Sequence, residues 1–383
     1  MGGSDPALKA PLVLIDATAI PANRGGVGRY VESIVGALAS AQARTIIVCQ
    51  TRDQALFESL GVQTIPAPSR VSRVSQRLLW EQFALPRLAR RLDVDLVHSP
   101  HYTFPLLMRV PRVVTIHDLT FFTMPELHSA VKRVFFRWWI RAASRFGVSV
   151  IAVSQATASE YARLTNAEPT SITVSHLGYD ERIFHAPGTE ELRALQETVP
   201  ALPPSWIAFL GTLEPRKNVV SLIEGYCDAV GRSTAEPPAL LLAGDDGWDD
   251  QVDAAISRAR QGGADVRKLG YLPLESLSAF LGGSTIFAYP SLGEGFGLPV
   301  LEAMASGACV LTTDRLSLPE VGGDAAVYTG VSSAAIADSL HALLEDEAHR
   351  ASIARAGVTR AMSFTWAAAA SRHVDAYRRA AHK

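Results

Sequence analysis

The sequence predicts an α/β protein with two successive domains, each a doubly wound parallel sheet with helices on both faces. Three observations lead to this fold class. Short β-branched apolar runs alternate with longer helical stretches, a rhythm typical of parallel sheets. A proline-rich stretch, residues 186–205, interrupts this rhythm, which then starts again. The length of 383 residues also suits two or three domains.

The first domain is expected to span residues 1–185. Its buried strands are expected at residues 12–15, 45–49, 96–98, 113–116 and 150–153. Helical stretches are expected between them at residues 28–41, 78–92 and 130–145. Because ligands of such sheets bind at the carboxyl ends of the strands, these ends are where functional residues should lie.

The second domain is expected to follow a linker, residues 186–205, that contains Pro187, Pro200, Pro203 and Pro204. It should span residues 206–364, with a final helical segment at 365–383. Its strands are expected at residues 206–210, 239–243, 286–289 and 310–312. Two doubly wound domains that face each other would enclose a deep ligand cleft between them.

The bulk composition excludes several classes of protein. The net charge of −2 gives no footprint for duplex nucleic acid, so we expect no nucleic-acid partner. The three cysteines are far apart, which argues against a disulfide scaffold or a zinc site. The sequence has no signal-peptide pattern at its start and no run of about 18 apolar residues. We therefore expect a soluble, cytoplasmic chain that can still touch a membrane surface.

The segment 291–302, Ser-Leu-Gly-Glu-Gly-Phe-Gly-Leu-Pro-Val-Leu-Glu, carries the most information about function. Its three glycines allow tight turns and close backbone approach. Pro299 suits the first position of a helix, and a helix start preceded by free N–H groups binds phosphate. Because Glu294 and Glu302 would repel phosphate, we expect them to accept hydrogen bonds from sugar or ribose hydroxyls. In the structural alternative, Glu294 is a solvated loop charge and Glu302 complements the helix dipole.

A second segment, residues 209–218, opens the second domain and places Arg216 and Lys217 just before the helix expected at 219–230. Cations at a helix start oppose the helix dipole, so a purely structural role is disfavoured. The pair makes sense if it neutralises a pyrophosphate. The alternative is an exposed loop pair.

Three further patterns are weaker. Residues 23–30, Asn-Arg-Gly-Gly-Val-Gly-Arg-Tyr, only partly match a dinucleotide fingerprint and predict a flexible loop before a helix. His117 and Asp118 end a strand and should point into the cleft, or else cap the strand end. His98 and His101 have a spacing that suits a metal, but no third ligand is apparent, so no metal is expected. The aspartates at 245, 246, 249 and 250 are expected to form a solvated loop.

Together these segments resemble glycosyltransferase family 4, the retaining enzymes of the GT-B fold, over nearly the whole chain. The resemblance rests on the first glycine-rich loop, His117-Asp118, residues 152–157, 176–180, 211–218, the Glu294 and Glu302 pair, and Phe364-Thr-Trp366. It implies two Rossmann-like domains and a final helix that crosses back to the first. One departure is Thr212, where many relatives carry Arg after the glycine; Arg216 is the substitute that the sequence offers.

The resemblance also implies roles by position. Glu294, with the backbone of Gly295, Phe296, Gly297 and Leu298, would hold the donor sugar, and Glu302 the donor ribose. Lys217 and Arg216, beside Gly211, would hold the diphosphate. The main chain at Tyr271 and Leu272 would meet the base. Gly26 would lie near the phosphate, and His117 near the transferred sugar.

The implied reaction moves a hexose, with a leaning to mannose, from a GDP- or UDP-linked donor to a glycan or glycolipid hydroxyl with retention. No Ser–His–Asp set or catalytic carboxylate pair is visible, so positioning and charge stabilisation would carry catalysis. The donor is a substrate, and neither cofactor nor metal is expected. The rival predictions are a nucleotide-sugar epimerase of the same architecture and a non-catalytic sugar-nucleotide binding protein.

The hypothesis about the acceptor depends on residues 131–145, which mix cations with large aromatics. Arg133, Arg137, Arg141 and Arg145 recur every four residues and so drift only slowly around a helix. Such a helix can lie on an anionic membrane, which would place the chain at the inner face of the membrane beside a lipid-linked acceptor. The alternative is that the aromatics pack the core while the arginines face water.

Overall fold

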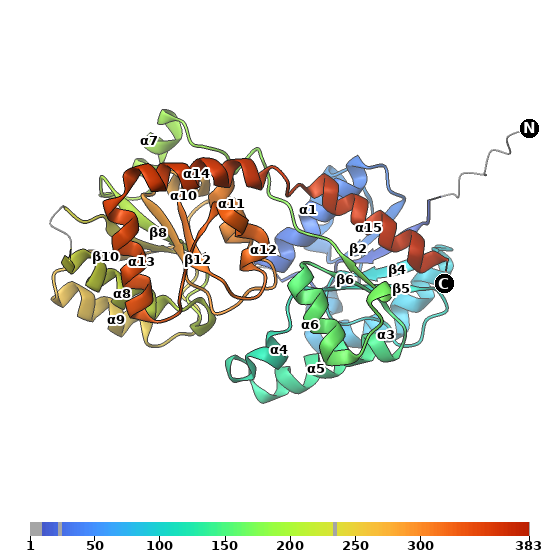
Figure 1. Ribbon diagram of the computed structural model, residues 1–383. Coiled ribbons are helices and arrows are strands. Elements are labelled where there is room, and N and C mark those ends of the chain that lie inside the picture. Colours follow the sequence, from blue (N-terminus) through green and yellow to red (C-terminus); the bar gives the residue numbers. More distant parts are fainter. Residues whose placement is uncertain (1–9, 22–24, 233–235, 383) are drawn as a thin grey trace, which may run out of the picture. The chain divides into compact units, whose positions relative to one another are not determined.

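The computed structural model describes residues 10–21, 25–232 and 236–382, and its chain divides into two compact units. The first unit comprises Met1–Gly178 and Trp366–Lys383, and the second comprises Tyr179–Thr365. Each unit is a parallel sheet covered by helices (Figure 1). The predicted α/β class with two Rossmann-like sheets is confirmed.

The first unit contains a seven-stranded sheet in the order β3-β2-β1-β4-β5-β6-β7. All of its strand pairs are parallel; Leu14, for example, pairs with Ile46 on one side and Val97 on the other. The strands are β1 (Val13–Asp16), β2 (Thr45–Cys49), β3 (Gln63–Pro66), β4 (Leu96–Ser99), β5 (Arg112–Ile116), β6 (Ser149–Ala152) and β7 (Ile172–Val174). The helices are α1 (Gly26–Ser40), α2 (Gln54–Ser59), α3 (Val74–Arg91), α4 (Thr120–Thr123), α5 (Ala130–Arg145), α6 (Gln155–Thr165) and α15 (Trp366–Ala381).

The second unit contains a six-stranded parallel sheet in the order β10-β9-β8-β11-β12-β13. The strands are β8 (Trp206–Leu210), β9 (Ala239–Ala243), β10 (Val266–Gly270), β11 (Ile286–Tyr289), β12 (Val310–Thr313) and β13 (Val327–Thr329). The helices are α7 (Thr189–Thr198), α8 (Val219–Arg232), α9 (Val252–Gln261), α10 (Leu277–Gly282), α11 (Leu298–Ala305), α12 (Leu318–Gly322), α13 (Ser333–Glu345) and α14 (Glu347–Ala361). Residues 186–205, which we expected to be a linker, contain α7 and belong to this unit.

The two faces of the first sheet are covered by different helices. On one face, α3 and α5 bury Leu85 and Trp139 against side chains such as Val97 and Val114. On the other face, α15 packs on α1 and on β4 to β7. The chain therefore returns to the first unit after it has completed the second.

Helix α15 is held by a buried polar network. The Tyr30 hydroxyl lies 2.8 Å from Nε2 of His373 and 2.9 Å from Oγ1 of Thr115. His98 bonds Thr115 through Nε2 at 2.9 Å and the Tyr377 hydroxyl through Nδ1 at 2.8 Å. Because buried polar groups are costly when unpaired, this network fixes the position of α15 on the sheet.

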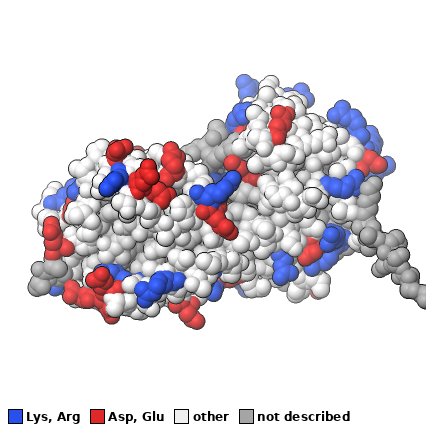
Figure 2. Space-filling view, turned by 90° about the horizontal axis from the view of Figure 1, so that it is seen from above, with Lys and Arg blue, Asp and Glu red and all other residues white. Residues whose placement is uncertain are grey.

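The units differ strongly in charge. The first unit carries 23 Lys and Arg against 13 Asp and Glu, and the second carries 13 against 25. Their formal charges of +10 and −12 give the net −2 of the chain. Figure 2 shows part of this imbalance on one face. Among the described residues, no helix is both long and apolar enough to span a membrane.

Candidate functional site

The loop between β11 and α11 carries Glu294 and is shaped by a glycine. Gly297 caps α11 with a φ of 104°, and a Cβ there would lie 2.9 Å from Cδ2 of Leu318. Both the backbone angle and the space exclude larger residues. Helix α11 begins at Leu298, one residue before the Pro299 that we expected as its first position.

Hydroxyl groups at the end of β12 and just after it hold this loop in place. Thr313 Oγ1 donates to the Ser291 carbonyl at 2.6 Å. Ser317 Oγ bonds the carbonyls of Glu294 and Phe296 at 2.8 and 2.9 Å. Sequence reasoning missed both residues, because a threonine and a serine near the end of a strand have no distinctive pattern.

Arg216 and Lys217 lie in a short 3-10 turn, Pro215–Lys217, directly before α8. Asn218 ends the turn with a φ of 59°, a left-handed angle that asparagine tolerates. The Leu292 amide donates to the Arg216 carbonyl at 2.8 Å, which ties this turn to the Glu294 loop. The two segments that the sequence singled out therefore lie side by side.

The charged groups of these segments form a buried ion cluster. Glu294 accepts from Arg216 Nη1 at 2.5 Å, Lys217 Nζ at 2.7 Å and Ser291 Oγ at 2.7 Å. The Tyr289 hydroxyl donates to the same carboxylate at 3.0 Å. Arg216 Nη2 also bonds Glu214 at 2.5 Å. Glu294, Lys217 and Glu214 are all at least nine-tenths buried.

Burial and ion pairing set the protonation of the cluster. Burial tends to raise the pKa of Glu294, but the Arg216 and Lys217 charges outweigh it and lower that pKa to about 2. Burial also lowers the pKa of Lys217, although Glu294 opposes this effect. The pKa of Tyr289 is raised well above its ordinary value, chiefly by burial. Glu294 is therefore a carboxylate with two cations aligned on it.

The other predicted residues of the second unit lie around this cluster. Gly211 begins the loop that leads to the cations, and a Cβ there would lie 3.8 Å from Lys217 Cε. Glu302 is the fifth residue of α11 and is 1% exposed, so it lies beyond the first turn, where an acidic side chain would complement the helix dipole. Tyr271 and Leu272 follow β10; the tyrosine is exposed and the leucine is buried.

The predicted residues of the first unit form a separate set. His117 follows β5, and its Nε2 lies 3.0 Å from the Pro100 carbonyl. Donation to that carbonyl leaves Nδ1 as an acceptor, and burial lowers the pKa of the ring. Asp118 Oδ1 accepts from the Thr120 amide and hydroxyl, so Asp118 caps the strand end. Gly26 begins α1, whereas Asn23 and Arg24 lie outside the described residues.

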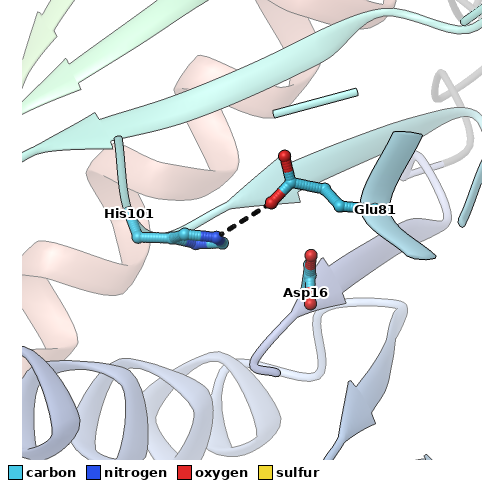
Figure 3. A group of neighbouring side chains, drawn as sticks. All are labelled: Asp16, Glu81 and His101. Carbon is cyan, nitrogen blue, oxygen red and sulfur yellow. Dashed lines mark ion pairs between the residues drawn. The ribbon is translucent and has the colours of Figure 1, made fainter. Parts of the chain in front are cut away.

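His98 and His101, whose spacing suggested a metal site, have different partners in the structure. Both ring nitrogens of His98 bond hydroxyl groups, as described above. His101 instead meets Asp16, at the end of β1, and Glu81 of α3, with ligand-type atoms within 4.8 Å of one another (Figure 3). Arg77 Nη1 lies 3.0 Å from Glu81 Oε2 and 3.1 Å from His101 Nε2. A guanidinium thus holds the place where a cation would contact these two ligands.

Comparison with known proteins assigns a family to both units. Residues 24–182 match the model of Glycosyltransferase Family 4, and residues 195–360 match that of Glycosyl transferases group 1. The chain is 31% identical to O-antigen chain mannosyltransferase B of Escherichia coli over 73% of each chain. It is 25% identical to O-antigen chain mannosyltransferase RfbU of Salmonella typhimurium, over 79% of this chain and 82% of that one.

A solved structure supports the fold. The Anabaena protein HepE, in complex with UDP and glucose, superposes with a TM-score of 0.73 at 18% identity, over 95% of this chain and 98% of that one. Its sheets and those described here share the two-domain GT-B architecture. The family matches over both units, together with a relative of similar length at 31% identity, show that the chain belongs to the glycosyltransferases of the GT-B fold.

Proposed function

We propose that this glycosyltransferase moves mannose from a nucleotide-diphosphate donor, GDP- or UDP-linked, to a glycan or glycolipid hydroxyl with retention and without a divalent metal. The names of the two O-antigen mannosyltransferases support the sugar and the acceptor class. The HepE complex with UDP and glucose supports the donor class. The observation that carries the proposal is the buried cluster of Arg216, Lys217 and Glu294.

The ion cluster suits a site in which the cations exchange a carboxylate partner for the phosphates of a donor. Two cations and two carboxylates, Glu214 and Glu294, balance each other without a ligand. A diphosphate is the stronger competitor for the cations, because it offers more charge and more acceptor oxygens than one carboxylate. When Arg216 and Lys217 turn to the phosphates, Glu294 is released to accept hydrogen bonds from the sugar. The start of α11 adds backbone N–H groups.

The other roles follow the resemblance. Glu302 binds the ribose, the backbone of residues 295–298 supports the sugar, and the main chain at Tyr271 and Leu272 meets the base. In the first unit, Gly26 serves the phosphate and His117 the transferred sugar. With Nε2–H given to Pro100, Nδ1 of His117 can accept a hydrogen bond from a sugar hydroxyl.

In the transfer step, the bond between the sugar C1 and the diphosphate oxygen breaks while the acceptor oxygen bonds C1 on the same face. The acceptor proton passes to the departing diphosphate. Arg216 and Lys217 stabilise the charge that develops on the leaving group, so the protein needs no base of its own.

The test is an incubation of the purified chain with GDP-mannose or UDP-hexoses and an oligosaccharide acceptor, with and without EDTA. We expect a glycosylated acceptor whose new linkage keeps the donor's anomeric configuration in NMR, and a rate that EDTA leaves unchanged. An epimerised donor formed without an acceptor would replace the proposal by an epimerase. Donor binding without any turnover would reduce the chain to a binding protein. If EDTA abolished the activity and magnesium restored it, transfer would require a divalent metal, contrary to the proposal.

We further propose that the first unit binds an anionic membrane surface through α5, where a lipid-linked acceptor would be found. Three apolar residues, Val131, Val134 and Trp138, lie exposed at a helical spacing. Trp138 and Phe146 line a groove of about 540 Å³ together with Arg137, Arg141 and Arg145. By contrast, Trp139 is buried in the core, so only part of the aromatic set is exposed. The +10 charge of the unit supports the choice of anionic lipid.

A further inference from the structure

Two large aromatic side chains stand out from the second unit at the carboxyl edge of its sheet. Trp248 follows β9 and is 60% exposed, and Tyr271 follows β10 and is 76% exposed. Strands β9 and β10 are neighbours, with Leu240 paired to Val266. The two rings are therefore carried by adjacent loops at the edge where sheets of this kind bind ligands.

Backbone hydrogen bonds tie these loops to the one that carries the cations. The Gly211 amide donates to the Ala243 carbonyl at 2.9 Å, and the Leu213 amide to the Asp245 carbonyl at 2.9 Å. In return, the Trp248 amide donates to the Leu213 carbonyl at 3.2 Å. The Gly244 amide donates to the Gly270 carbonyl at 2.8 Å. The loops after β8 and β9, together with the end of β10, thus form one hydrogen-bonded frame.

Two glycines make this close approach possible. Gly244 has a φ of 133°, and a Cβ there would lie 2.2 Å from the Gly211 carbonyl oxygen. Gly247 has a φ of 64°, and a Cβ there would lie 2.2 Å from the Leu213 carbonyl oxygen. No side chain fits at either position, so the residue after Gly247 is held directly against the 211–213 loop. That residue is Trp248.

We propose that Trp248 is a stacking platform for the nucleobase of the donor. The inference rests on the proposed function and assigns a residue to the base beyond the main chain at Tyr271 and Leu272. A nucleoside diphosphate has an anionic end and a flat aromatic end. The frame offers cations at Arg216 and Lys217 and an exposed indole on the adjoining loop. Stacking on an aromatic side chain accommodates any base, because every base has a π face.

The charges around Trp248 orient the nucleotide. Asp245, Asp246, Asp249 and Asp250 lie in the same loop, and Lys268 pairs with Asp246 at 3.1 Å. These carboxylates repel phosphate, whereas Arg216 and Lys217 attract it. A nucleotide on this frame therefore places its base at the Trp248 end and its diphosphate at the cation end.

The test compares the full-length wild type with Trp248→Ala and Trp248→Phe, and with Trp138→Ala as a matched exposed tryptophan of the first unit. Titration calorimetry measures the affinity for GDP, UDP and inorganic pyrophosphate. We expect Trp248→Ala to weaken the binding of the tighter nucleotide by roughly tenfold to a hundredfold. The pyrophosphate affinity and the melting temperature of Trp248→Ala should stay close to those of the wild type. The nucleotide affinity of Trp248→Phe should also stay close to that of the wild type. The nucleotide should quench tryptophan fluorescence in the wild type and in Trp138→Ala, and much less in Trp248→Phe.

The outcomes separate this inference from the proposed function. A wild type that binds a nucleotide diphosphate, with Trp248→Ala binding it equally well, overturns the Trp248 assignment alone. A wild type that binds pyrophosphate but neither nucleotide overturns the donor class and the stacking role together. Equal losses for pyrophosphate and nucleotide in Trp248→Ala would show a disturbed loop and no base contact, which also overturns the assignment.

Discussion

At the scale of single residues, Glu294 and Glu302 are both buried, and we propose different tasks for them. Glu294 touches the cations that we assign to the leaving group, whereas Glu302 lies on α11. We expect Glu294→Ala to lower kcat by about 10²–10³, the usual loss when one preorganised electrostatic partner of a reacting group is removed. Glu302→Gln should instead raise the donor KM by about tenfold to a hundredfold, since one charged acceptor is lost.

Steady-state kinetics with the donor identified in the transfer assay measures both effects. Glu224→Gln is the matched control, because Glu224 lies half-exposed on α8 and forms a surface ion pair with Arg258. This control should behave as wild type. Wild-type kinetics for both site variants would show that neither carboxylate serves the donor.

The residue scale also shows where sequence reasoning stops. The glycine-rich context marked Glu294 and Glu302, and the cations before α8 marked Arg216 and Lys217. The sequence could not show that these charges pair with one another, because the contact joins residues 78 positions apart. Tyr289 and Ser291 were missed as partners of Glu294, since each was assigned only to a strand or a turn.

At the scale of elements, the strands that we predicted lie inside the sheets and the four that we missed lie at the edges. Strands β3, β7, β10 and β13 are the outermost strands of the two sheets. Their side chains are largely half-exposed, so they lack the continuous apolar run of a central strand. The hydrophobic pattern therefore predicts the buried central strands of a parallel sheet but not its edge strands.

Helix α5 gives a prediction at the same scale. The wild type should co-sediment with vesicles that contain anionic lipid, should bind less as salt rises, and should not bind neutral vesicles. Trp138→Ala combined with Arg141→Glu should reduce this binding severalfold, because it removes an inserted ring and reverses a charge beside it. Arg163→Ala on α6 is the control, since Arg163 is exposed but paired with Glu160. No association at low salt would favour an acceptor free in solution.

At the scale of the whole molecule, the final helix holds the first unit together. Removal of the residues after Thr365 takes away α15, which buries Ala369, Ala370, His373 and Tyr377. The apolar face of the first sheet would then be open to water, and Tyr30 and His98 would lose hydrogen bonds. We expect hydrogen exchange to speed up across β4 to β7 by orders of magnitude in the truncated chain. Unchanged exchange and melting would show that the helix is dispensable.

The two units should also respond to acid in different ranges. Burial lowers the pKa of His373 to about 4, below its value of 6.5 in the unfolded chain. As pH falls from 6.5 towards 4, the imidazole is protonated in the unfolded chain but not in the folded one, so the first unit loses stability. Glu294 has a pKa of about 2 against 4.5 when unfolded, so the second unit loses stability below pH 4.5. Each change is worth about 3 kcal/mol.

Hydrogen exchange from pH 7 to pH 3 separates the units, with β4 and β5 reporting on one and β8 and β11 on the other. We expect the amides of the first unit, corrected for intrinsic rates, to lose protection at the higher pH. His373→Gln should weaken that dependence without abolishing it, because burial also lowers the pKa of His98 and of His117, and it should leave the second unit unaffected. Loss of protection in both units at the same pH would contradict the assignment of the two acid responses to His373 and Glu294.

The return of the chain to its first unit has a consequence for biosynthesis. The second unit is an uninterrupted segment, Tyr179–Thr365, whereas the first needs both Met1–Gly178 and the helix that follows Thr365. On the ribosome, the unit that is translated second can therefore complete its fold before the unit that is translated first. Until α15 emerges from the exit tunnel, the face of the first sheet that packs against Tyr377 stays exposed. Chaperones can bind the nascent chain at that face.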